Sequence, residues 1–235
     1  MTTLTFDPFE EFQQFLIKLS FLELIENSDY IAASKKLHKR VLAILIVEHQ
    51  FDLELTSDLP ELKDTIKSYL NEFRSDLLSS LFIFQVGLYK AAMMTARSAL
   101  ENLLRVIAGC QGLDFRACKS VSDLIELVKV APLRNSNPLF EASIQTLLTS
   151  YSDFCDYVHS TGEEFLSLDR KLGDMPRWEP GVGTERADSL VKMIQAATCT
   201  LLVLKPLVLQ HLRHDQKDIV LDALSKQMKA GLVAG

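Results

Sequence analysis

The chain has 235 residues, of which 48% are hydrophobic and 24% charged, with a formal net charge of −6 at pH 7. This length predicts one large domain or two small ones. The negative net charge argues against a protein that binds nucleic acid over a uniformly basic surface, but it is compatible with a local basic patch. The chain has only nine glycines and seven prolines, which favours long helices because a β-protein of this length needs many turn residues.

The cysteines, the first residues and the apolar runs argue against a metal-binding, a secreted or a membrane-spanning protein. Four separated cysteines form no C-x-x-C pair, and no Glu/His set has metal-ligand spacing, so we expect neither a metal nor a cofactor. The first residues lack the basic region of a signal peptide. The longest apolar run, 41–47, is far shorter than the ~20 residues of a membrane span. We therefore expect a cytoplasmic protein without membrane contact.

The N-terminal third predicts two helices. The first spans 8–26, with Asp7 as N-cap, and its Phe-rich start either binds a partner or folds back into the core; the phenylalanines are Phe6, Phe9, Phe12 and Phe15. The second spans 30–50 and carries the basic cluster 34–40. This cluster is either a surface for nucleic acid or an acidic partner, or an ordinary solvated helix face.

The middle of the chain predicts a helical hairpin. After a break at 52–63, Ser57 or Asp58 with Pro60 indicates a new helix start. From 61 to 109 the sequence is helix-compatible throughout and Gly87 is the only glycine or proline before the end. A single helix of that length is unusual in a globular domain, so we predict helices over 61–83 and 87–109 with a bend between them.

Several elements are predicted beyond the hairpin: a short helix from a Ser120 or Ser122 cap to Val130, a loop over 131–138, a helix over 139–158 with Asn137 as N-cap, an irregular segment over 163–184, a helix over 185–214 kinked at Pro206, and a helix over 216–229. No stretch shows sustained strand alternation. The fold class is therefore all-α: a helical bundle over 59–235 with an N-terminal helical pair, 1–58, docked on it.

A charged pair interrupts the most apolar helix. Arg97 and Glu101 lie one turn apart in 87–109, next to the apolar face, and Arg105 continues the row. Arg–Glu–Arg at a spacing of four is also what a solvated ladder of ion pairs looks like. The pattern therefore allows either a surface ladder or a partly buried pair that serves a site.

The second candidate is the end of the helix over 139–158, where His159 follows Cys155 and Tyr151 on the same side. A histidine at a helix C-terminus is stabilised in its charged form by the helix dipole, which by itself explains such a residue. Its pKa also suits proton transfer near neutral pH. Both interpretations remain open from the sequence.

Together these two stretches resemble the HEPN superfamily, compact α-helical bundles of prokaryotic toxins and defence systems. "LYKAAMMTARSALENLLR" carries an R-x-x-x-E pattern at Arg97 and Glu101, and "YSDFCDYVHS" matches a later helix end of that superfamily through Tyr151, Tyr157, Val158, His159 and Ser160. The resemblance covers residues from about 61 to 214. It implies an RNA-acting protein, a ribonuclease effector of a toxin–antitoxin or antiphage system, that forms a homodimer or a hetero-complex with another protein.

The resemblance also implies site residues. His159, Arg97 and Glu101 would be catalytic, with Tyr151, Tyr157, Ser160 and Arg105 supporting them. Ribonuclease members carry R-x(4–6)-H, whereas the positions for that arginine here are Ser152, Asp153 and Phe154. Arg97 would therefore have to supply the cation beside the phosphate. Two alternatives remain: a catalytically inactive helical adaptor or immunity module, and a small-molecule or nucleotide sensor that uses the same site.

Two further motifs carry little weight. Lys205-x(5)-His211 has the same spacing with lysine in place of arginine, but a lysine cannot grip a phosphate with two parallel bonds. The "PGVGT" segment, 180–184, lacks the lysine and the flanking strand of a phosphate-binding loop, so it predicts a turn.

Overall fold

The computed structural model describes residues 9–10, 13, 22–55, 60–159 and 177–234. Within these residues every regular element is helical and no strand is present, so the predicted all-α helical bundle is confirmed. The elements are α2 (Leu22–Ile25), α3 (Ser28–Glu54), α4 (Pro60–Gln85), α5 (Tyr89–Cys110), η1 (Phe115–Ala117), α6 (Val121–Lys129), α7 (Pro132–Ser136), α8 (Pro138–His159), α9 (Val182–Leu204), α10 (Leu207–His211), α11 (His214–Ala223) and α12 (Lys226–Ala234).

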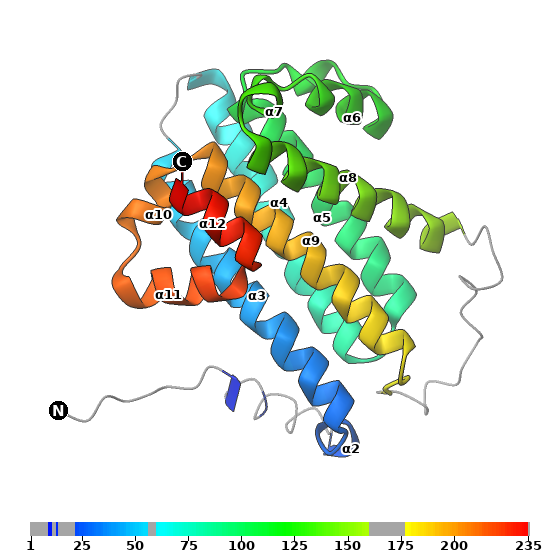
Figure 1. The fold of residues 1–235 in the computed structure, drawn as a ribbon. Helices are drawn as coiled ribbons and strands as arrows, with labels where there is room; N and C mark the ends of the chain where they lie inside the picture. Colours follow the sequence, from blue (N-terminus) through cyan, green and yellow to red (C-terminus); the bar gives the residue numbers. More distant parts are fainter. Residues whose placement is uncertain (1–8, 11–12, 14–21, 56–59, 160–176, 235) are drawn as a thin grey trace.

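The long helices form two layers, and α9 lies in the middle of one of them. Figure 1 shows α3, α9 and α8 side by side, with the α4–α5 hairpin behind them. Helix α9 packs against α3, α8 and α5, and most of its side chains are buried. It is also the one described helix that is long and apolar enough to cross a membrane, but 67% of its most apolar window is buried within the bundle. Burial in the core thus accounts for its composition.

Helix α3 begins where an asparagine caps it. The Asn27 Oδ1 accepts hydrogen bonds from the backbone N–H groups of Asp29 and Tyr30, both at 3.0 Å, so the helix starts slightly before the predicted position. Its buried side chains belong to the same core as those of α4, α5, α8 and α9. The expected boundary between 58 and 59 falls outside the described residues, as does most of the helix predicted over 8–26.

The basic cluster of α3 is paired within the molecule. Lys36 forms an ion pair with Asp188 of α9, and Lys39 forms one with Asp222 of α11 at 3.4 Å. These pairs favour a solvated helix face over a nucleic-acid surface. The adjacent Phe9 is buried with its ring 5.8 Å from that of His38, so at this residue the Phe-rich start packs back on the bundle; Phe6, Phe12 and Phe15 lie outside the described residues.

The bend predicted at 84–87 is the turn that joins α4 to α5. Gly87 adopts a φ of +81°, where an L side chain is strained. A Cβ atom at this position would lie 2.4 Å from the backbone oxygen of Arg177. The turn therefore needs glycine for two reasons, its backbone conformation and the close approach of the segment that leads into α9.

We expect Gly87→Ala to lower the free energy of unfolding by about 2–4 kcal/mol, because the left-handed backbone costs about 1–2 kcal/mol and the clash with a carbonyl oxygen adds to it. Gly181→Ala is the comparison: its φ is +82° but a Cβ there meets no atom within 4 Å. Denaturant unfolding of both variants checks the difference. Equal losses in the two variants would contradict the close contact with Arg177.

Local capping signals placed the start of two helices correctly. Ser120 and Asp123 form a reciprocal capping box at the start of α6. The Asn137 Oδ1 accepts the backbone N–H of Phe140 at 3.0 Å, and α8 follows from Pro138. Because each cap depends on neighbouring residues alone, the helix starts near 121 and 138 could be predicted from the sequence.

Three predicted elements were wrong. The segment 131–138 is not only a loop, since Pro132 starts the short helix α7. Pro206 ends α9 instead of kinking it, because Lys205 leaves the helical conformation, with φ −137° and ψ 85°. The last predicted helix is divided into α11 and α12, because Leu224 is extended and the Ser225 hydroxyl accepts the N–H of Met228 to start a new helix.

Candidate functional site

Helices α5 and α8 pack together, as expected, and one polar network joins them. The Arg97 Nε donates a hydrogen bond to the Tyr151 hydroxyl at 3.2 Å, and that hydroxyl donates to the Glu101 Oε1 at 3.1 Å. Arg97 and Glu101 also form an ion pair at 3.2 Å. We call these three residues the α5–α8 network. It brings together three of the side chains that the sequence singled out.

The network lies at the edge of the core. The Arg97 and Glu101 side chains keep 25% and 22% of their surface exposed, whereas Tyr151 is buried. The Arg97 guanidinium also lies 5.3 Å from the centre of the Tyr151 ring, a cation–π contact. The hydrogen bond and the ion pair that Arg97 forms with the described residues both use its Nε.

The electrostatics keep Tyr151 protonated. The pKa of Tyr151 is raised to about 12, chiefly by burial; the hydrogen bond from Arg97 opposes the rise and the nearby Glu101 carboxylate adds to it. Burial on its own lowers the pKa of Arg97, but the hydrogen bond to Tyr151 and the nearby Cys155 and Glu101 outweigh it and the pKa is raised. At neutral pH the network therefore holds a fixed cation, a neutral phenol and a carboxylate.

We expect the protein to lose stability as the pH rises from about 10 to 12. An unfolded tyrosine ionises near pH 10, while folded Tyr151 keeps its proton to about pH 12, so the unfolded state binds fewer protons in this window and is favoured. Chemical denaturation across the window measures the slope. Tyr151→Phe should make it less steep, and an unchanged slope would show that Tyr151 titrates like an unfolded tyrosine.

Arg105 does not join the network. Its Nη1 donates to the Glu101 backbone oxygen at 3.0 Å, and its guanidinium lies 5.2 Å from the Tyr69 ring centre on α4. The expected Arg–Glu–Arg ladder is thus incomplete, since only Arg97 pairs with the Glu101 carboxylate. The row of charges instead connects α5 to α8 on one side and to α4 on the other.

Tyr157 contacts a residue that the sequence analysis missed. The Arg186 guanidinium of α9 lies 4.1 Å from the Tyr157 ring centre, and Arg186 is only 9% exposed. Tyr157 therefore supports the α8–α9 contact. No local signal marks Arg186, because its partner lies in another helix and its neighbour Glu185 makes it resemble an ordinary surface charge.

His159 is the last residue of α8. It follows Tyr151 by eight residues, about 12 Å along the helix axis. Its side chain and Ser160 lie outside the described residues, so their place beside Arg97 stays a prediction. Of the positions where the R-x(4–6)-H motif would place an arginine, Ser152 and Asp153 are exposed and Phe154 is buried in the core.

The other candidates are explained by packing. His211 pairs with Glu54 of α3, and Lys205 is the residue at which α9 ends. Only Pro180 and Gly181 of the segment "PGVGT" form the predicted turn, because α9 already begins at Val182. Gly183 contacts the Trp178 ring, from which a Cβ at this position would lie 2.6 Å. Among the described residues no group of three His, Cys, Asp or Glu side chains is placed to hold a metal ion.

The α5–α8 network combines a positioned guanidinium with a carboxylate and a neutral phenol, which is suited to binding an anionic oxygen and holding it in one orientation. None of its three residues is a histidine. Comparisons with known proteins add no assignment: no family model, no curated protein and no solved structure matches this chain.

Proposed function

We propose that this chain is a HEPN-like, RNA-acting protein of the cytoplasm and a ribonuclease effector of a prokaryotic toxin–antitoxin or antiphage system. The observation that supports this most is the α5–α8 network: Arg97 is held at its Nε by Glu101 and Tyr151 while a quarter of its side chain stays exposed. A guanidinium fixed in this way binds phosphate through two parallel bonds. Tyr151, the third member of the network, lies on α8, the helix that ends in His159.

In this proposal the roles are divided. Arg97 neutralises the phosphate of the RNA backbone, Glu101 and Tyr151 hold Arg97 in one rotamer, and His159 moves a proton to or from the reacting oxygen. The arginine therefore comes from α5 and not from the turns of α8 that precede His159. We include a homodimer in the proposal, since Leu78 and Phe82 lie one turn apart on α4 with 41% and 47% of their surface exposed.

A second candidate is a helical interaction module that has no catalytic activity. The observation that favours it is the sequence before His159: Asp153 places an exposed negative charge where ribonuclease relatives have a cation, and Phe154 is part of the core. A carboxylate at that position repels a phosphate. This candidate keeps the fold and its binding surfaces and loses the cleavage step.

Substitution of the histidine separates the two candidates. If the chain is a ribonuclease effector, its expression slows growth of the host and the purified protein cleaves single-stranded RNA, and His159→Ala abolishes both effects. The matched control is His214→Ala, because His214 is 94% exposed on α11 and pairs with Asp218 at the surface. Equal behaviour of wild type and His159→Ala, with both soluble, would exclude the effector and leave the interaction module.

A further inference from the structure

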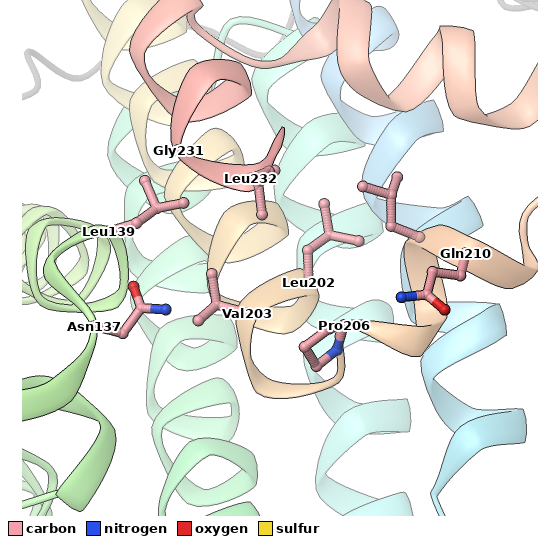
Figure 2. Close-up of a pocket in the computed structure, with 9 residues that line it drawn as sticks. Asn137, Leu139, Leu202, Val203, Pro206, Gln210, Gly231 and Leu232 are labelled. Atoms are coloured by element: carbon pink, nitrogen blue, oxygen red, sulfur yellow. The ribbon is translucent and has the colours of Figure 1, made fainter. Parts of the chain in front are cut away.

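A pocket lies at the opposite end of α8 from His159, where α8, α9, α10 and α12 meet. It has a volume of about 250 Å³ and shares no residue with the α5–α8 network. Figure 2 shows the side chains around it. The lining residues are Asn137 and Leu139 at the start of α8, Leu202 and Val203 at the end of α9, Pro206, Leu209 and Gln210 after the break, and Gly231 and Leu232 on α12.

Two features shape the pocket, a break that turns the chain away from the α9 axis and a close approach of α12 to α8. Pro206 ends α9 and redirects the chain into α10, so α10 does not continue along the α9 axis. On the other side, Gly231 lets α12 approach α8 closely, since a Cβ there would lie 3.0 Å from the Leu139 side chain. The space between the α9–α10 break and α12 is therefore left as a pocket that is partly open to solvent and has both aliphatic and amide side chains in its lining.

Two amide side chains face this space from opposite sides. The Asn137 Oδ1 accepts the N–H of Phe140 and caps α8, so the orientation of the amide is determined and its Nδ2 points away from the helix. Figure 2 shows this nitrogen directed toward the pocket and the nitrogen of the Gln210 amide approaching from the far side. The pocket thus offers a donor nitrogen held in place at Asn137, the exposed amide of Gln210, which can turn its nitrogen toward a ligand, and aliphatic side chains between the two.

We propose that this pocket binds a small, uncharged molecule with an aliphatic middle and a hydrogen-bond acceptor, such as a carbonyl oxygen, at each end. No charged side chain is among its lining residues in the described part of the chain, so a charged ligand would lose its hydration without a partner. A cavity of about 150 Å³ holds benzene, and this pocket is larger. Its occupation joins α8, α9, α10 and α12.

Dimethyl adipate is the probe, because it is uncharged and has an ester carbonyl at each end of a four-carbon chain. Methyl hexanoate, with one ester, and the adipate dianion are the comparison compounds. Saturation-transfer NMR and the shift of the melting temperature measure binding to the full chain. We expect dimethyl adipate to bind more tightly than methyl hexanoate, by about threefold to tenfold for one hydrogen bond, and adipate not to bind.

Asn137→Asp and Gln210→Leu test the two donors. The aspartate keeps the cap of α8 and suits the helix N-terminus, but it removes the donor nitrogen, so the fold is retained while the affinity for dimethyl adipate falls about threefold to tenfold. The matched control is Gln227→Leu, at an exposed position of α12 outside the pocket. Absence of diester binding, equal binding of adipate, or equal affinity in all three variants would overturn the proposal.

Discussion

Phe154→Arg should prevent the chain from folding, whereas Asp153→Arg should leave the fold intact. Phe154 has no exposed surface and lies in the core shared by α5, α8 and α9. Loss of a buried phenylalanine costs about 3–5 kcal/mol, and an unpaired buried charge adds several more. This total is comparable with the whole stability of a typical domain, about 5–15 kcal/mol. Asp153 is exposed, so an arginine there stays in water.

The measurement is thermal unfolding followed by circular dichroism, together with size-exclusion chromatography. Ser152→Arg is a further control, because position 152 is also exposed on α8. A Phe154→Arg variant that melts like wild type would show that the end of α8 is not packed in the core. Asp153→Arg also tests the function, because an arginine at 153 is separated from His159 by five residues and creates the R-x(5)-H motif. We expect this variant to cleave RNA faster than the wild type.

The second large effect is expected at Arg97. Arg97→Ala should lower the free energy of unfolding by about 1–3 kcal/mol, the range for a hydrogen bond to a charged group, because it leaves Tyr151 and Glu101 without their cation. It should also remove binding of single-stranded RNA. Arg97→Lys keeps the charge and most of the stability but cannot form two parallel bonds to a phosphate, so we expect RNA affinity to fall about tenfold.

Arg213→Ala is the control for charge, since Arg213 is 74% exposed and pairs with Asp215 at the surface. Denaturant unfolding gives the stability and fluorescence polarisation gives the RNA affinity. Loss of stability without loss of RNA affinity would mean that the α5–α8 network is structural only. If Arg97→Ala changed neither quantity, the network would be an ordinary surface ion pair and the site hypothesis would be wrong.

The ion pair of Arg97 with Glu101 could be anticipated from the sequence, because both residues lie on one helix face at a spacing of four. Their third partner was not. Tyr151 is 54 residues from Arg97, and only the packing of α5 against α8 brings its hydroxyl between the two charges. The same holds for Arg186 and Tyr157, which meet because α9 packs on α8.

What the sequence by itself determined is the local part of the fold. The helical hairpin with its turn at Gly87, and the helix starts capped by Ser120 and Asn137, depend on residues a few positions apart, and they agree with the structure. The tertiary structure decided which helices pack against one another and where a pocket remains between them. It also decided which charged side chains form ion pairs, as with Lys36 and Asp188. These features arise from contacts between distant segments, whose geometry no local periodicity or cap encodes.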